Sequence, residues 1–105
     1  MTQFTVYQNK NPQSKKHIPL LLDIQSNLLE ELNTTVIVPL CKLDQSKNKV
    51  LTQLTPVFNI DGAQYLMLAP QLAGIARKQL GKAIGNIASS RAEIIGAIDF
   101  LLSGV

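Results

Sequence analysis

The sequence has little of the chemistry that builds metal sites, disulfides or nucleophilic active sites. Its 105 residues include one cysteine, one histidine and no tryptophan. A single thiol cannot form an internal disulfide, and a structural zinc site needs about four Cys or His ligands, so both are excluded. Cys41 follows an apolar segment and is predicted to be a small packed residue, whereas His17 lies in a polar stretch predicted to be a solvated loop. A catalytic triad therefore has few residues to draw on.

Long apolar runs are missing as well. No segment approaches the ~20 apolar residues needed to cross a bilayer, and residues 1–4 have neither the basic nor the apolar part of a signal peptide. We therefore expect a cytoplasmic protein. The composition, 46% hydrophobic and 16% charged, is that of a globular chain, and the length predicts one domain over residues 1–105. No phosphate-loop, dinucleotide or metal motif is found, so no cofactor and no metal are expected.

The basic residues form three small clusters and not one strong patch. The net charge is +3 and the pI is near 9.2. The clusters are Lys10–Lys16, Lys42–Lys49 and Arg77–Lys82. They lack the interleaved aromatic residues of a groove for single-stranded nucleic acid, and we predict that they are solvated. A contact with DNA phosphates within a larger assembly remains open.

Short apolar segments at close spacing predict a mainly β fold. The predicted strands are residues 3–7, 20–24, 34–38, 57–60 and 64–68. Pro39 is expected to end the third strand or to place it at an edge, because it cannot donate to a ladder. Asp61-Gly62 suits the left-handed φ values of a tight hairpin turn. Residues 28–32 are expected to be a loop or one helical turn, and residues 43–54 and 71–88 are ambiguous.

Residues 89–103 have the pattern of an amphipathic helix. Ser90 and Glu93 have the spacing of a capping box, in which each side chain bonds a free backbone N–H. The apolar face contains Ile94, Ile98, Leu101 and Leu102, with Ile95 at its edge. The opposite face contains Gly96, Asp99 and Ser103, and Gly104 and Val105 follow. The helix either only closes the core or also presents its polar end to a partner. Strands followed by one helix predict a small antiparallel barrel.

Five segments of the chain carry a family resemblance. They are Gln3–Tyr7, Asp23–Ser26, Val36–Leu40, Pro56–Ile60 and Glu93–Val105. In this order, and over essentially the whole length, they resemble the CcdB toxins of bacterial toxin–antitoxin modules. The resemblance implies an SH3-like barrel with one C-terminal helix, assembled as a symmetric homodimer. It also implies a strand at residues 74–79, where local propensity leaves helix and strand open.

The resemblance further implies a function that depends on binding and not on catalysis. CcdB toxins bind the A subunit of DNA gyrase and trap the enzyme with its DNA cut. A CcdA-type antitoxin removes the toxin through a disordered C-terminal segment, and the pair represses its operon, so operator DNA is contacted only by that complex. The implied gyrase-binding residues are Ser26, Leu28, Leu29, Asp99, Ser103, Gly104 and Val105. Leu28 and Leu29 could equally be core residues. Ser26 could be a helix cap, and Gly104 could simply end the helix.

Two of these positions depart from the well-known plasmid toxin of the family. That toxin has an asparagine at the position of Asp99 and a tryptophan at the position of Ser103. A serine can offer a hydrogen bond but no aromatic face to an arginine. One alternative is therefore a degenerate toxin that binds antitoxin but no longer poisons gyrase. Another is an mRNA endoribonuclease of the same fold, for which His17, Arg77 and Arg91 are the available side chains.

Overall fold

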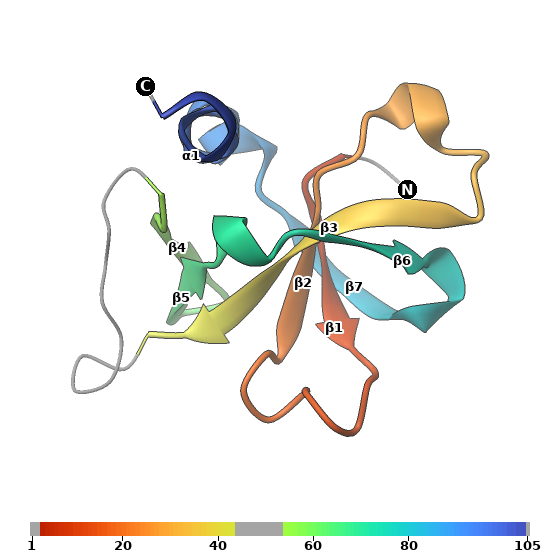
Figure 1. The fold of residues 1–105 in the computed structure, drawn as a ribbon. Coiled ribbons are helices and arrows are strands. Elements are labelled where there is room, and N and C mark those ends of the chain that lie inside the picture. Colours follow the sequence, from red (N-terminus) through yellow and green to blue (C-terminus); the bar gives the residue numbers. More distant parts are fainter. Residues whose placement is uncertain (1–2, 44–53, 105) are drawn as a thin grey trace.

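The computed structural model describes residues 3–43 and 54–104 and shows a curled antiparallel sheet with a helix at one end (Figure 1). Its elements are β1 (Thr5–Asn9), β2 (Leu20–Asp23), η1 (Asn27–Leu29), β3 (Thr34–Lys42), β4 (Val57–Ile60), β5 (Ala63–Met67), η2 (Ala69–Gln71), β6 (Ala73–Ala76), η3 (Arg77–Gln79), β7 (Leu80–Asn86), η4 (Ala88–Ser90) and α1 (Arg91–Ser103), where η marks a 3₁₀ turn. The strands run in the order β4-β5-β3-β2-β1-β7, and β6 also pairs with β3. This confirms the predicted fold class, a small antiparallel barrel with a C-terminal helix.

β3 runs through Pro39, so the prediction that this proline ends the strand or lies at an edge is wrong. β3 pairs with β2 on one side, and with β6 and then β5 on the other. Its residues 34–37 pair with β6 and residues 40–42 with β5, which leaves Pro39 between the two partners. On that side the Leu68 N–H donates to the Pro39 carbonyl at 3.0 Å. The proline is tolerated because no ladder bond requires its missing N–H.

The predicted hairpin is confirmed by strands β4 and β5. Ile60 pairs with Ala63, so the connection consists of Asp61 and Gly62. Their φ values are 52° and 81°, both in the left-handed region that a two-residue hairpin turn of this kind requires. Local turn chemistry was sufficient to set the register here.

Residues 73–86 form two strands separated by a 3₁₀ turn, and only the first strand overlaps the one that the resemblance implied. The strand expected at residues 74–79 ends at Ala76, η3 occupies the next three residues, and β7 was not predicted. β7 pairs with β1, and a Cβ added at Gly81 would lie 2.6 Å from the backbone oxygen of Gln8. Glycine is therefore needed where the two strands approach, and pairing across the sheet overrides the helical propensity of this segment.

The core has two parts, one on each face of the central strands. The main part lies between the curled sheet and α1 and contains Phe4, Val6, Leu20, Leu22, Val38, Leu40, Phe58, Ile60, Met67, Ala69, Ile94 and Ala97. The second part, on the other face, contains Tyr7, Leu21, Ile37 and Leu80. Successive strand residues point to opposite faces, so β2 is buried on both sides. Because both faces of β2 are buried, apolar residues occupy the consecutive positions Leu20, Leu21 and Leu22.

The helix α1 begins at Arg91, after the turn η4, and the predicted capping box is not formed. Ser90 is the N-cap residue, but its side chain makes no capping hydrogen bond. Its N–H donates to Ile87 at 2.9 Å, and its φ and ψ are −101° and 20°. The chain therefore enters α1 from a turn, whereas a capping side chain normally needs an extended residue. Leu102 is also misassigned: it is 76% exposed, although the pattern placed it on the apolar face.

Candidate partner-binding surface

The loop between β2 and β3, residues 24–33, presents apolar side chains to solvent. Leu28 is 93% exposed, and Leu29 and Leu32 are 46% and 49% exposed. Every residue from 26 to 34 is exposed, so no buried side chain anchors this stretch. The structure thus decides the open question about Leu28 and Leu29: they are surface residues and not part of the core. Exposed leucines concentrated on one short loop are typical of a contact surface.

Polar groups give the β2–β3 loop its local shape. The Ser26 hydroxyl accepts a hydrogen bond from the Leu28 N–H at 3.2 Å and caps η1. This confirms the alternative that Ser26 is a cap. The Asn27 side chain accepts from the Gln3 N–H at 2.7 Å, which links the loop to the start of the chain's described part. Ser26 therefore has a structural role, and it is also exposed beside Leu28.

A buried carboxylate lies beneath the loop. Asp23, whose side chain is 5% exposed, accepts from the Thr35 hydroxyl at 2.8 Å and from the Gln25 N–H at 3.1 Å. Its other oxygen lies 3.7 Å from Nη1 of Arg77. Burial, together with the Asp23 carboxylate, raises the pKa of the neighbouring Tyr7 phenol. A carboxylate with this little solvent needs its hydrogen bonds and its cationic partner.

The end of α1 exposes the polar residues that the sequence pattern placed outward. Gly96, Asp99 and Ser103 are all exposed. The Ser103 hydroxyl donates to the Asp99 carbonyl at 2.7 Å, so it is engaged within the helix. Gly104 is the C-cap, with φ of 75°, and its N–H donates to the Phe100 carbonyl at 2.8 Å. The implied contact Val105 lies outside the described residues.

Leu102, at the same end of α1, is an exposed apolar residue that the sequence analysis did not include in the candidate surface. It lies beside Ser103 and exposes most of its side chain, whereas Ala97 and Ile94, about one and two turns earlier, are fully buried. Its position at the edge of the apolar arc, in the last turn, was the available signal. A helix turn that extends beyond its packing partner leaves such an edge residue uncovered.

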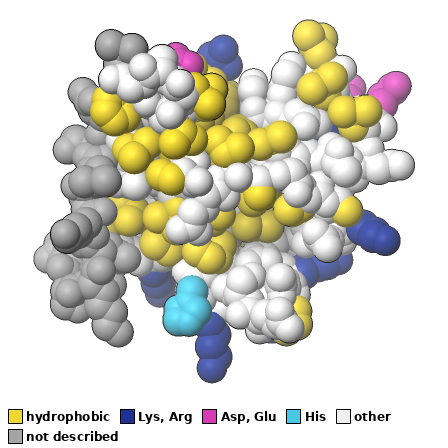
Figure 2. Space-filling model, in the orientation of Figure 1, with side chains coloured by type: hydrophobic (Ala, Val, Ile, Leu, Met, Phe, Trp, Pro, Cys, Tyr) yellow, Lys and Arg dark blue, Asp and Glu magenta, His cyan; other side chains and the backbone are white. Residues whose placement is uncertain are grey.

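One chain does not bring the two parts of the implied site together. Figure 1 shows α1 at the upper left and the β2–β3 loop, in orange, at the upper right. In the same view, hydrophobic side chains form a band across the face between them (Figure 2). Within residues 3–43 and 54–104, the exposed large hydrophobic side chains are those of Leu28, Leu29, Leu32 and Leu102. A surface of this kind is suited to a macromolecular partner.

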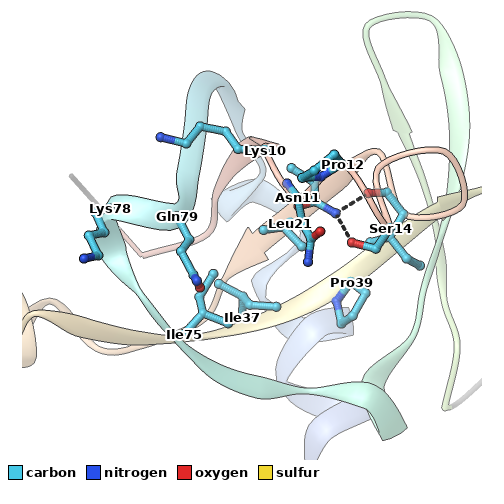
Figure 3. Close-up of a pocket in the computed structure, with 12 residues that line it drawn as sticks. Lys10, Asn11, Pro12, Ser14, Leu21, Ile37, Pro39, Ile75, Lys78 and Gln79 are labelled. Atoms are coloured by element: carbon cyan, nitrogen blue, oxygen red, sulfur yellow. Dashed lines mark hydrogen bonds between the residues drawn. The ribbon is translucent and has the colours of Figure 1, made fainter.

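A cleft of about 690 Å³ lies on the second face of the central strands (Figure 3). Its floor is apolar, with Leu21, Ile37 and Ile75, and its rim carries Lys10 and Lys78. The fold thus brings the first and third basic clusters to one cleft, which the sequence analysis did not foresee. Such a cleft can hold an anionic group next to an apolar one. The second basic cluster, Lys42–Lys49, lies mostly outside the described residues.

Two of the three side chains available for RNA cleavage make separate contacts in the structure. Arg77 donates from Nε to the Leu32 carbonyl at 2.7 Å, and the Arg91 guanidinium lies 5.7 Å from the centre of the Phe4 ring. His17 is exposed on the β1–β2 loop. Burial raises the pKa of Cys41, which keeps it protonated and weakly nucleophilic near neutral pH.

Among residues 3–43 and 54–104, no group of three or more His, Cys, Asp or Glu side chains is placed to hold a metal ion. Within the same ranges, no helix has the length and apolar character required to cross a membrane.

Comparison with known proteins defines the class and then the family. A chain of a solved structure, described as an endoribonuclease in complex with its cognate antitoxin from a mycobacterial species, matches with a TM-score of 0.73. The match covers 97% of this chain and 94% of that chain at 15% identity, so it shows a shared fold alone. The architecture is that of the small barrel toxins. The family model described as CcdB protein matches residues 3–104, and the chain belongs to the CcdB family, whose members are toxins of toxin–antitoxin modules.

Proposed function

We propose that this protein binds the A subunit of DNA gyrase and traps the enzyme with its DNA cut. The observation that carries the proposal is the exposure of the implied contacts in a chain that belongs to the CcdB family over residues 3–104. Leu28 is almost fully exposed, and Asp99, Ser103 and Gly104 face solvent at the end of α1. The protein acts in the cytoplasm by binding, without a cofactor and without a catalytic step.

The binding unit in this proposal is a symmetric homodimer. One chain holds the β2–β3 loop and the end of α1 far apart, and the hydrophobic band between them is available for a second copy (Figure 2). A two-fold assembly presents each surface twice, and a two-fold target such as the gyrase A dimer can engage both copies. Dimerisation therefore supplies the extended surface that a single barrel lacks.

The remaining partners follow from the family. A CcdA-type antitoxin neutralises the toxin, and the complex of the two proteins binds operator DNA and represses the operon. The basic residues Lys10 and Lys78, on the rim of the cleft, are suited to an acidic partner. The fold match to a toxin solved with its antitoxin is consistent with this partnership.

An endoribonuclease is the second candidate, because the solved structure of matching fold is described as one. The engagement of the Arg77 guanidinium with backbone carbonyls leaves it poorly placed to reach a scissile phosphate. Incubation of purified protein with RNA tests this candidate. Cleavage that is lost in both His17→Ala and Arg77→Ala variants would establish it in place of gyrase binding.

A DNA cleavage assay tests the leading proposal directly. Purified gyrase, supercoiled plasmid, ATP and the toxin are incubated and then treated with detergent and protease. Linear DNA is expected with the wild-type chain and with the exposed control variant Gln13→Glu, and none with a chain lacking residues 103–105. Circular dichroism verifies that the shortened chain is folded, since the buried residues Ile94 and Ala97 lie earlier in α1.

The outcomes separate the candidates. Linear DNA from the shortened chain would contradict the assigned contact site. No linear DNA from a folded, dimeric wild-type chain that still binds its antitoxin would identify a degenerate toxin. The substitution at Ser103 would then be the first cause to examine, because the hydroxyl bonds to its own helix and leaves no large face for a partner.

A further inference from the structure

We infer that Arg77 is a positioning residue that holds the β2–β3 loop in the shape that exposes its leucines. The inference rests on the proposed function only for its consequence, the loss of gyrase binding. Its structural part concerns this chain alone. Arg77 belongs to η3, more than forty positions along the chain from the loop, and no sequence pattern connected the two.

Burial does not explain the order of the loop. Residues 26–34 are all exposed, and even Leu29 and Leu32 are 46% and 49% exposed, so packing contributes little to the order of this stretch. A ten-residue connection without buried side chains should have many conformations of similar free energy. The polar contacts of the loop must therefore select the one conformation that is observed.

Three of these polar contacts come from Arg77. Its Nε donates to the Leu32 carbonyl at 2.7 Å and its Nη2 to the Leu29 carbonyl at 3.4 Å. Its backbone N–H donates to the Asn33 carbonyl at 2.8 Å. One residue therefore satisfies three carbonyls within five positions of the loop. The planar guanidinium has several donors in a fixed arrangement, which suits it to hold neighbouring carbonyls at once.

The arginine is itself held in place from below. Its Nη1 lies 3.7 Å from Asp23, whose carboxylate also accepts from Thr35 and Gln25. Gln25 in turn donates from its side chain to the Thr34 carbonyl at 3.2 Å. Asp23 ends β2, and Thr34 begins β3, so this network joins the two ends of the loop to the sheet. Arg77 connects that rigid base to the exposed part.

The consequence is a loop whose outer part, from Leu29 to Asn33, is bonded to the rest of the fold through Arg77. Loss of the guanidinium removes the Nε–H donor of the Leu32 carbonyl and one donor of the Leu29 carbonyl, which keeps the Leu32 N–H at 3.1 Å, and it lets the segment from Leu28 to Leu32 leave its observed conformation. A partner that binds the exposed leucines must then order the loop, and binding weakens although no contact residue has changed. Hydrogen bonds to a charged donor are strong enough to account for a change of about tenfold in loop opening.

The experiment compares loop opening, global stability and gyrase binding in the full chain. Arg77→Lys keeps a cation near Asp23 but cannot reach both carbonyls, so it is the principal variant; Arg77→Met is the second. Lys82→Met is the matched control, since Lys82 is an exposed cation on β7 that belongs neither to the β2–β3 loop nor to the lining of the cleft. A glutamate-specific protease reports on the loop, because Glu30 and Glu31 lie in it, and Glu93, the other glutamate, lies in α1.

For Arg77→Lys we expect cleavage at Glu30 and Glu31 to be about tenfold faster. Gyrase affinity should fall by about the same factor. The urea midpoint of the barrel should stay close to that of the wild type. The control should match the wild type in all three measurements. Faster loop cleavage in a protein that never binds gyrase would support the positioning role and refute the proposed function. Unchanged loop cleavage in Arg77→Lys and Arg77→Met, or global unfolding of Arg77→Lys, would overturn the inference.

Discussion

Truncation of Leu28 tests whether the β2–β3 loop is a contact surface. The side chain is 93% exposed, so Leu28→Ala removes almost no packing from the folded chain. The free energy of unfolding should therefore change by less than about 0.5 kcal/mol, as for most surface substitutions. Any larger loss of function must then arise in a complex and not in the fold.

The expected loss of affinity follows from the area that a partner would cover. Leucine has three more carbon atoms than alanine, and burial of each contributes about 0.8 kcal/mol, so full coverage by gyrase is worth about 2.4 kcal/mol. That free energy corresponds to a dissociation constant about 60-fold higher. Leu29 is already half-buried by its own chain, so it has less area left for a partner.

The assay is a titration of the gyrase A subunit with the purified toxin, paired with urea unfolding of each variant. Gln13→Ala, on the exposed β1–β2 loop, is the control for binding. Ile94→Ala is the control for stability, because Ile94 is fully buried and its truncation should cost about 2–5 kcal/mol. Equal affinities of Leu28→Ala and Gln13→Ala for gyrase would refute the assignment of Leu28 to the contact surface.

Three further predictions concern the helix end, the sheet and the core. Ser103→Trp should strengthen gyrase trapping by about 0.5–2 kcal/mol if the aromatic ring stacks on an arginine of the partner, and weaker trapping would show that the register is wrong. Gly81→Ala should lower the free energy of unfolding by about 1–3 kcal/mol, because its Cβ would meet the Gln8 oxygen, whereas Gly85→Ala meets nothing within 4 Å; equal urea midpoints would contradict this. Burial raises the pKa of Tyr7, so stability should be full below about pH 10 and fall as the pH rises through the raised value, and Tyr7→Phe should remove that decline in alkaline unfolding curves.

The elements that the sequence predicted correctly are those set by neighbours in the chain. Asp61 and Gly62 form the expected turn because both can adopt a positive φ, and the turn sets the pairing of the strands on either side. The polar face of α1 follows from side-chain periodicity. In each case, residues a few positions apart contain the necessary information.

The elements that were missed depend on partners far along the chain. Pro39 lies inside a strand because β6 and β5 share one side of β3 and leave a gap at the proline. The strand β7 forms against β1 although its sequence has helical propensity. Ser90 has the right type and spacing for a capping box, but the preceding turn gives it the wrong backbone conformation.

The sequence by itself determined the family, the mainly β architecture with a C-terminal helix, and the residue types of the candidate surface. Only the tertiary structure decided which of those residues face solvent. Leu28 and Leu29 lie outside the core, on a loop whose carbonyls accept hydrogen bonds from Arg77, more than forty residues along the chain. Periodicity and turn chemistry are local, whereas exposure depends on what the rest of the chain covers, and so it is decided by folding.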